Sequence, residues 1–286
     1  MTDELVSVII VTHDSERHLG ACLQALKTAL AMQPHELVVV DNNSTDNPEP
    51  VILEFFPGAT VIRSDANSGF AAGCNRGAAQ ANGEFLLFLN PDVIVDPHAV
   101  VALRRVSETG GRLGAVGGRL RFPDGRFQPT CRNFPTATNL IFSRGSALGW
   151  LLGGTRVYTL GDYDEPMRVP ATAATMMMIR RRIFDRLGGF DERFFMYLED
   201  TDLCYRLSRR NYDNLFVPMA GGIHHWAEGS RARTARRTWM HHRSMWKYFL
   251  KHLPNGFTLL ILPLLLTVNL LLVLAVNSVG GRRRRV

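Results

Sequence analysis

Strand-like and helix-like hydrophobic patterns alternate through the first 95 residues, and this alternation constrains the fold more than any other feature. Short apolar runs predict strands at residues 5–11, 36–40, 60–63 and 84–89. Apolar residues at helical spacing predict the intervening helices at 15–30, from 46 to 56, and at 69–81. This order predicts an α/β fold with a mostly parallel, Rossmann-like sheet, right-handed crossovers and flanking helices. Ligands of such sheets bind at the carboxyl ends of the strands.

The pattern changes after Asp96. Residues 123–170 are rich in Pro, Gly, Arg and Thr and look loop-like, and a loop of this length is usually functional or disordered. The remaining predicted elements are helices at 97–109, 181–187 and 234–253, and strands at 171–179 and 215–218. The helix at 97–109 leads to a segment at 113–122.

Polar residues follow the second predicted strand and open the third predicted helix. Asp41 ends the second strand, where it can accept hydrogen bonds from a ribose or a base edge; an Asx turn is the alternative. Glycines 69, 73 and 77 predict a helix with one closely approached face, whose N-terminus could face phosphate or sugar oxygens. Close packing of this helix on the sheet is the alternative. The spacing differs from the G-x-G-x-x-G of dinucleotide-binding enzymes.

The fourth predicted strand ends in Asn90-Pro91-Asp92. A carboxylate there is well placed to bind a divalent cation on a diphosphate. Further along, His224 and His225 are adjacent, so both cannot face one site from an extended segment. One of them could ligate a metal or contact phosphate, and a structural role is the alternative.

Three carboxylates, those of Glu199, Asp200 and Asp202, stand within four positions after an aromatic run. If a helix starts here, acidic side chains in its first turn favour the helix dipole. The same turn can aim one carboxylate out of an apolar floor, where its pKa can be tuned for general-base catalysis. A solvated acidic turn is the alternative.

Charge divides the chain unevenly. The segment from Ala227 onward holds eleven basic residues and one acidic residue, so its net charge is +10. The whole chain has a net charge of +7, so residues 1–226 have a net charge of −3. The body is therefore not expected to bind nucleic acid. Four widely spaced cysteines without a CxxC pair indicate neither a disulfide framework nor a zinc site.

The C-terminal quarter has the composition of a membrane-associated segment. Residues 259–276 are almost entirely apolar and long enough for a transmembrane helix. Because Pro263 and Asn269 also suit a re-entrant or surface-lying segment, that arrangement is one alternative, and a buried core helix is the other. The helix predicted at 234–253 is basic and places four large apolar residues roughly on one face, namely Trp239, Trp246, Phe249 and Leu253. Such a helix suits an anionic membrane surface.

Taken in order, six segments resemble family 2 glycosyltransferases of the GT-A fold, and most closely the bacterial rhamnosyltransferase-like branch. The resemblance covers about residues 5–231, and its segments are 6–12, 40–46, 67–75, 89–93, 188–192 and 199–203. Two departures stand out: Asn90 replaces the first Asp of the family's D-x-D motif, as is frequent in this branch, and His13-Asp14 replaces an aromatic residue and Asn.

The resemblance implies a role for each matching position. Asp200 would be the catalytic base, with Glu199 supporting it or orienting the acceptor. Asp92 would hold Mg²⁺ or Mn²⁺ on the diphosphate, helped by His224 or His225. The nucleotide and the donor pocket would be contacted by Thr12, Asp41, Asn67, Gly69, Asn75 and Asn90.

These observations predict an inverting, metal-dependent glycosyltransferase with three parts: a GT-A catalytic domain at 1–231, a basic amphipathic juxtamembrane helix at 232–256, and an apolar membrane segment with a basic tail at 257–286. The donor would be a nucleotide sugar, dTDP-rhamnose by resemblance to the branch. The acceptor would be a lipid-linked sugar or another glycan of the cell envelope, received near Arg126, Arg132 and Arg144. The enzyme would then work at the cytoplasmic face of the cell membrane. The alternatives are a non-catalytic, membrane-anchored nucleotide-sugar-binding subunit and, with least support, a nicotinamide-dependent oxidoreductase.

Overall fold

The computed structural model describes residues 5–136, 159–225 and 234–280. The chain forms two compact units. The first comprises residues 1–134, 159–192 and 199–231, and the second comprises residues 135–158, 193–198 and 232–286. Each unit is described separately below.

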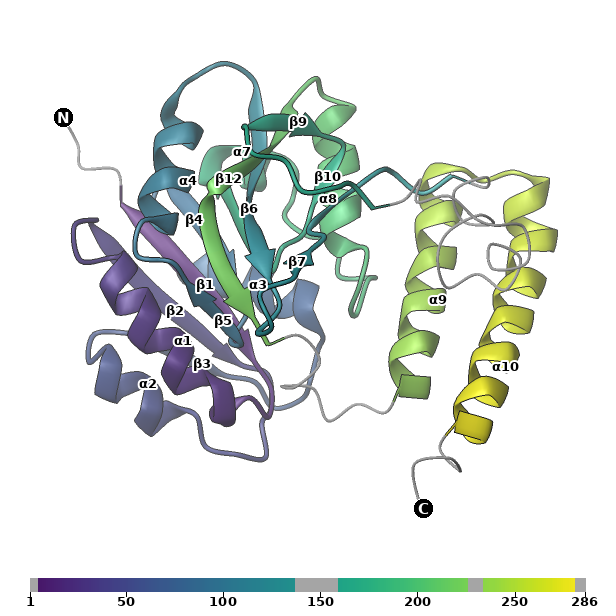
Figure 1. Ribbon diagram of the computed structural model, residues 1–286, viewed down its shortest axis with the longest axis horizontal. Helices are drawn as coiled ribbons and strands as arrows, with labels where there is room; N and C mark the ends of the chain where they lie inside the picture. Colours follow the sequence, from purple (N-terminus) through teal and green to yellow (C-terminus); the bar gives the residue numbers. More distant parts are fainter. Residues whose placement is uncertain (1–4, 137–158, 226–233, 281–286) are drawn as a thin grey trace. The chain divides into compact units, whose positions relative to one another are not determined.

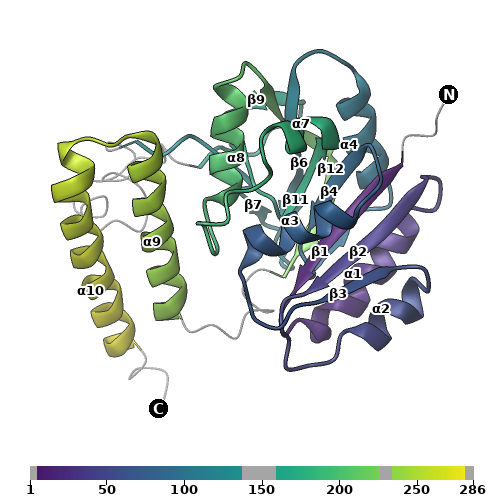
Figure 2. The same ribbon diagram turned by 180° about the vertical axis from the view of Figure 1, so that it is seen from behind.

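The first unit is built on a twisted central sheet (Figures 1 and 2). One half is parallel, and its strands in spatial order are β3 (Thr60–Arg63), β2 (His35–Asp41), β1 (Val6–Thr12) and β4 (Phe85–Leu89). The other half continues with β11 (Met176–Arg180), β6 (Leu113–Arg121), β12 (Asp213–His224) and β5 (Val93–Val95).

The predicted mostly parallel sheet holds for the first half but needs correction in the second. There β11 runs antiparallel to both β4 and β6, and β5 runs antiparallel to β12, while β6 and β12 are parallel. An apolar run does not encode the direction of its strand, which the connections determine. The result is a mixed α/β sheet with flanking helices.

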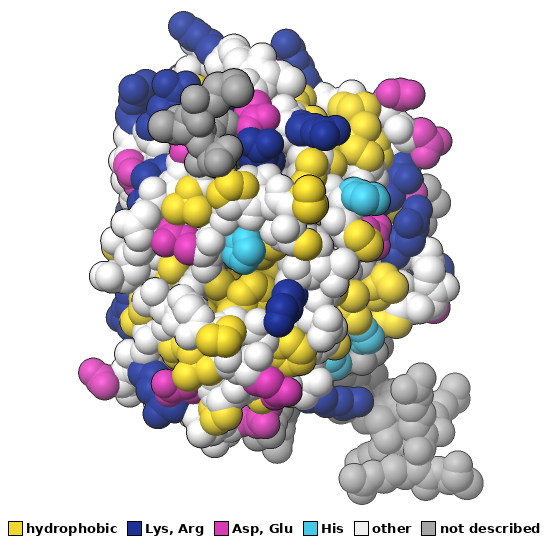
Figure 3. Space-filling model, turned by 90° about the vertical axis from the view of Figure 1, so that its left-hand side faces the viewer, with side chains coloured by type: hydrophobic (Ala, Val, Ile, Leu, Met, Phe, Trp, Pro, Cys, Tyr) yellow, Lys and Arg dark blue, Asp and Glu magenta, His cyan; other side chains and the backbone are white. Residues whose placement is uncertain are grey.

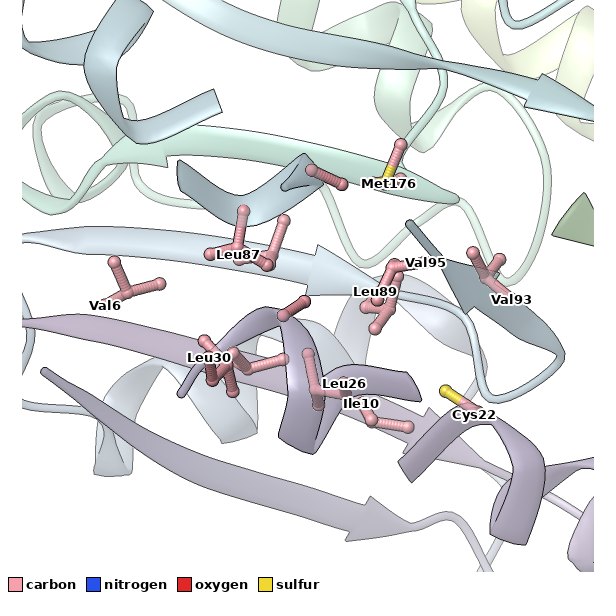
Figure 4. Close-up of a cluster of buried hydrophobic side chains, with 14 of the residues drawn as sticks. Val6, Ile10, Cys22, Leu26, Leu30, Leu87, Leu89, Val93, Val95 and Met176 are labelled. Atoms are coloured by element: carbon pink, nitrogen blue, oxygen red, sulfur yellow. The ribbon is translucent and has the colours of Figure 1, made fainter. Parts of the chain in front are cut away.

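Helices cover both faces of this sheet. On one face lie α1 (Glu16–Ala29), α2 (Glu49–Phe55) and α4 (Ala99–Glu108), and on the other lie α3 (Phe70–Gln80), α7 (Arg181–Arg186) and α8 (Glu199–Ser208). Strand β1 serves both layers, because Val6, Val8 and Ile10 face the first core and Ile9 and Val11 face the second. Figure 4 shows the first core, where residues of α1 meet those of β1, β4, β5 and β11.

Helix α3 packs unusually close to the sheet. A Cβ at Gly73 would lie 2.7 Å from Val11 Cγ1, and one at Gly77 would lie 2.6 Å from Ile9 Cγ2. These two glycines therefore serve helix–sheet packing, which is the alternative that the sequence left open. Gly69 differs from them, since it is the N-cap of α3 with φ of 89°.

Several predicted elements need new boundaries. The strand predicted at 171–179 is two strands, β10 (Ala171–Thr172) and β11, because residues 173–175 leave the ladder to contact the site described below. The strand predicted at 215–218 is the middle of β12, which continues through a bulge to His224. Strand β5 was not predicted. The helix predicted from residue 46 begins later, because the N-cap of α2 is Pro48. The Oδ2 of Asp46 instead accepts from the N–H of Glu16 at the start of α1.

The predicted loop at 123–170 contains three short strands, β7 (Phe127–Gln128), β8 (Cys131–Arg132) and β9 (Met167–Val169). Strand β8 pairs with β10 in a separate two-stranded sheet. Arg144 and the rest of 137–158 lie outside the described residues. Basic and acidic side chains are interspersed on the face shown in Figure 3, in keeping with the small net charge of residues 1–226.

The second unit is a helical hairpin of α9 (Thr234–His252) and α10 (Leu262–Gly280), joined through a π-helical turn, η1 (Phe257–Ile261). Asn269 Nδ2 lies 3.0 Å from His242 Nε2 across the hairpin. The predicted one-sided apolar face of α9 is only partly observed, since Trp239 and Trp246 are exposed but Phe249 is buried. None of the described helices combines the length and apolar character needed to cross a membrane, so the predicted membrane insertion is not confirmed.

Candidate active site

Asp92 and His224 meet at one edge of the sheet. Asp92 follows β4, and His224 ends β12; their side chains are 14% and 3% exposed. The Nε2 of His224 lies 3.2 Å from Oδ1 of Asp92. On its other side, Nδ1 of His224 lies 3.0 Å from Oε1 of Gln128 on β7. Gln128 was not singled out in the sequence, and it fixes the orientation of the imidazole ring.

This arrangement fits a divalent cation. Gln128 holds one ring nitrogen of His224, and the other ring nitrogen faces the carboxylate of Asp92. An imidazole nitrogen and a carboxylate oxygen are both ligands that divalent cations accept in proteins. Within the described ranges no cluster of three or more His, Cys, Asp or Glu side chains could hold a metal alone. The two groups therefore suit a metal that is completed by diphosphate oxygens and water.

His225 has different surroundings. Its backbone N–H donates to the carbonyl of Asp92 at 3.0 Å, and its ring packs against His18 of α1 with centroids 5.2 Å apart. The structure thus brings His224, and not the side chain of His225, against Asp92. The prediction that the adjacent histidines face different ways agrees with this geometry.

Asp200 lies in the first turn of α8 and accepts four hydrogen bonds. Its Oδ1 accepts from the backbone N–H of Thr201 at 2.6 Å and from the Thr201 hydroxyl at 3.1 Å. Its Oδ2 accepts from Arg132 Nη2 at 3.0 Å and from the backbone N–H of Ala174 at 3.3 Å. The carboxylate is well oriented, and the acidic turn is buried, so the solvated-turn alternative is wrong.

The two flanking carboxylates differ from Asp200 and from each other. Glu199 is buried, and its Oε2 has no hydrogen-bond partner among the described residues. Burial, together with the neighbouring charge of Asp200, raises the pKa of Glu199 to about 8. Asp202 is fully buried and paired with Arg206 at 2.8 Å, and the guanidinium of Arg206 also donates to the carbonyls of Leu187 and Gly189. Asp202 therefore orients Arg206, and Arg206 holds the turn at 187–189 in place.

The residues predicted to contact the donor divide into buried and accessible groups. Thr12 is fully buried, and its hydroxyl has no partner in the described part of the chain, so it lies behind the surface of the site. Asp41 is its neighbour across the ladder, and Asp41 Oδ1 accepts from the N–H of Ser44 at 2.9 Å. The side chain of Asp41 therefore stabilises the turn that follows β2, as the turn alternative expects, with the bond reaching three residues along the chain. Asn90 is half-buried at the turn that carries Asp92.

Asn42 is the residue that organises the loop before α3, and the sequence analysis missed it. Its Nδ2 donates to Asn67 Oδ1 and to the carbonyl of Gly69, both at 3.0 Å, and its Oδ1 accepts from Ser68 N–H at 3.1 Å. Asn67 Oδ1 also accepts from the N–H of Gly69 at 3.0 Å. The structure thus gathers Asn67 and Gly69 around Asn42 at the end of β2. A polar side chain directly after a strand-ending Asp was the available signal.

Asn75 is engaged with the backbone of Phe190. Its Nδ2 donates to the Phe190 carbonyl at 2.8 Å and to Glu192 Oε1 at 2.9 Å, and its Oδ1 accepts from Phe190 N–H at 2.8 Å. The structure therefore gives Asn75 the role of tying α3 to the segment before α8. Its predicted donor contact stays a prediction.

Comparison with known proteins decides the family. The model of glycosyl transferase family 2 matches residues 7–188. The chain belongs to this family. It is therefore a glycosyltransferase, and the alternatives of a non-catalytic subunit and an oxidoreductase gain no support.

Curated relatives include rhamnosyltransferases. The chain is 30% identical over 259 residues to the N-acetylglucosaminyl-diphospho-decaprenol L-rhamnosyltransferase of Mycobacterium tuberculosis, covering 85% of this chain and 83% of that protein. It is 27% identical over 256 residues to the rhamnosyltransferase WbbL of Escherichia coli, covering 85% and 92%.

Solved structures show the same fold. The mannosyltransferase PcManGT of Pyrobaculum calidifontis, in complex with GDP-Man and Mn²⁺, aligns with a TM-score of 0.60 at 17% identity over 96% of this chain and 75% of that one. GalNAc-T7 with UDP, GalNAc and Mn²⁺ aligns with a TM-score of 0.54 at 18% identity over 78% of this chain and 44% of that one. The fold is therefore GT-A-like.

Proposed function

We propose that this glycosyltransferase inverts the anomeric centre as it moves a sugar from a nucleoside-diphosphate donor to a lipid-linked acceptor. The observation that carries the proposal is the oriented carboxylate of Asp200 in the first turn of α8, in the same unit as the Asp92–His224 pair. The relatives named for rhamnosyl transfer support L-rhamnose as the sugar. The name of the Mycobacterium relative supports N-acetylglucosaminyl-diphospho-polyprenol as the acceptor.

In the proposed reaction Asp200 acts as the general base. The acceptor hydroxyl gives its proton to Asp200, and its oxygen forms a bond to the anomeric carbon. The bond from that carbon to the diphosphate breaks, and its electron pair leaves with the nucleoside diphosphate. Attack from the face opposite the leaving group inverts the configuration.

Asp92 and His224 would hold the divalent cation, Mg²⁺ or Mn²⁺, and Gln128 would keep the ring of His224 turned toward it. Such a cation neutralises charge that develops on the leaving diphosphate. Both structural neighbours contain Mn²⁺, which supports this assignment. Asn90 in place of a second carboxylate leaves the protein with one fewer negative ligand, so the diphosphate would supply more of the coordination.

Donor specificity would come from the loops at the ends of β1 and β2 and the start of α3. Asn67 and Gly69 lie there and are held by Asn42, and Asp41 lies at the end of β2, where it accepts from the N–H of Ser44. The exposed tryptophans and basic residues of α9 support contact with an anionic membrane surface. The site would then work at the cytoplasmic face of the membrane, where it meets nucleotide sugars.

The test is product formation from a panel of nucleotide sugars, with the lipid-linked acceptor in detergent and a series of Mg²⁺ and Mn²⁺ concentrations. Wild type should transfer one sugar, dTDP-rhamnose being the expected donor, and Asp200→Asn should lose at least about 100-fold in kcat. Donor and acceptor binding by Asp200→Asn should persist. Equal activity of the two proteins would contradict the role of Asp200, and activity that survives complete chelation would contradict the metal.

A further inference from the structure

The hydrogen bonds of Asp200 leave it no free acceptor position. A carboxylate has about four lone-pair sites, and four donors from Thr201, Ala174 and Arg132 occupy them. A base that takes a proton from an incoming hydroxyl must first accept a hydrogen bond from it. One of the four donors must therefore leave before the reaction proposed above can begin.

Exposure indicates which donor leaves. Thr201 is fully buried and Ala174 is 2% exposed, and three of the four bonds come from these two residues. The side chain of Arg132 is 23% exposed, whereas that of Asp200 is 9% exposed. Arg132 is therefore the donor that stands between the carboxylate and solvent.

The backbone of Arg132 is fixed while its side chain is long and jointed. Arg132 lies on β8, paired with Ala171 of β10, and bridges to Thr159 on its other side. Withdrawal of the guanidinium from Asp200 therefore needs only side-chain rotation, without movement of the strand.

A guanidinium that leaves a carboxylate needs another anion of similar geometry, and phosphate oxygens meet this need with paired hydrogen bonds. We propose that Arg132 is a positioning residue that covers the carboxylate of Asp200 and is drawn off it by a phosphate or diphosphate group of the acceptor. The inference rests on the proposed function, and it makes recognition of the acceptor's charge the event that frees the base. Arg126 cannot do the same, because it is exposed on a turn and paired with Asp124 at 2.6 Å.

Other charged or titratable groups surround Asp200. Glu199 and Cys204 on α8 and Cys131 on β8 face the same centre, and Asp202 is already paired with Arg206. Of the described groups in this set, Arg132 is the cation bonded directly to Asp200.

The experiment uses the full-length enzyme with two acceptors of the same sugar and lipid chain, one linked through diphosphate and one through a neutral ether. Wild type, Arg132→Gln and Arg132→Lys are compared, with Arg168→Gln as the matched control and thermal unfolding as a check of folding. Arg168 has an exposed side chain that pairs with Asp213 at 3.2 Å. We expect Arg132→Gln to lose about 10- to 100-fold in kcat/KM with the diphosphate acceptor, the range for a lost charge-assisted hydrogen bond. With the neutral acceptor it should be at least as active as wild type. Arg132→Lys should keep part of the preference, and Arg168→Gln should match wild type.

The separation of kcat from KM gives a second readout. In the complex with the diphosphate acceptor, Arg132 has left Asp200 and binds the acceptor. Arg132→Gln should therefore raise the KM for that acceptor much more than it lowers kcat. A loss confined to kcat would mean that Arg132 stays on Asp200 during catalysis and would overturn the proposal.

The remaining outcomes are also decisive. An equal loss with both acceptors would show that Arg132 supports the base itself. If Arg132→Gln kept the wild-type preference for the charged acceptor, Arg132 would not recognise the acceptor. If its loss were confined to the KM of the donor, Arg132 would bind a phosphate of the donor instead. Either result would overturn the proposal. If wild type transfers no sugar to either acceptor, the proposed function fails before this inference is reached.

Discussion

The backbone N–H of Ala174 donates to Oδ2 of Asp200 at 3.3 Å, which places the start of α8 directly on the segment before β11. The carbonyl of the next residue, Thr175, accepts from the N–H of Asn90 at 3.0 Å. Two consecutive residues thus hold the proposed base on one side and the turn of Asp92 on the other. Backbone contacts of this kind fix the spacing of two groups more firmly than flexible side chains do.

Gln128 should tune the proposed metal site through His224. Gln128→Leu removes the hydrogen-bond partner of His224 Nδ1, so the imidazole ring loses its fixed orientation. We expect the Mn²⁺ concentration for half-maximal activity to rise by about 10- to 100-fold, the usual cost of such a change. His225→Gln is the control, since its ring packs on His18, and it should leave the metal requirement unchanged. Equal effects of the two variants would contradict the assignment of His224.

Asn42 should control the affinity for the nucleotide-sugar donor. Asn42→Asp replaces the donating Nδ2 by an oxygen that faces Asn67 Oδ1 and the carbonyl of Gly69, so these acceptors repel it. We expect KM for the nucleotide sugar to rise by about 10- to 100-fold, the effect of two lost buried hydrogen bonds. Asn43→Asp makes the same chemical change at an exposed neighbour and should behave as wild type. Isothermal titration with the nucleoside diphosphate would measure the difference directly.

Local patterns predicted much of the first half of the fold. Strands β1 and β3 and helix α3 begin and end within one or two residues of their predicted limits, because their apolar periodicity is encoded locally. The second half depends on distant contacts. Strand β12 continues through Pro218 because β5, β6 and β9 pair with it, and none of these partners is adjacent in sequence.

The site shows the same division. Asp92 was predicted from its place after an apolar strand. The acidic turn at 199–202 was predicted from its composition, and the family resemblance singled out Asp200 within it. Arg132 was predicted only as one of three arginines that could receive the acceptor, and Gln128 was not predicted at all. Their roles depend on β7 and β8 folding back to the ends of β12 and α8, which no local period reveals.

Gly189 should tolerate substitution less well than its neighbour. Both Gly188 and Gly189 have positive φ, 74° and 72°, so alanine is strained at each by about 1–2 kcal/mol. A Cβ at Gly188 meets nothing within 4 Å, but one at Gly189 would lie 2.5 Å from Asn75 Oδ1. We expect Gly189→Ala to lower the free energy of unfolding clearly more than Gly188→Ala, because it also disturbs the bonds from Asn75 to Phe190. Chemical denaturation would show the difference, and equal losses would mean that Asn75 shifts freely.

Glu199 should make stability depend on pH. Its pKa is raised to about 8 in the folded protein from an ordinary value of 4.5, so the folded state binds more protons than the unfolded state between these values. The free energy of unfolding should therefore fall as pH rises through this window, by at most about 1.4 kcal/mol per pH unit.

Glu199→Gln removes that titration while keeping the shape of the neutral acid, so the variant should match wild type near pH 5 and be more stable than wild type at pH 8. Urea denaturation at a series of pH values measures this difference. A constant difference across the series would show that Glu199 is ionised in the folded protein throughout.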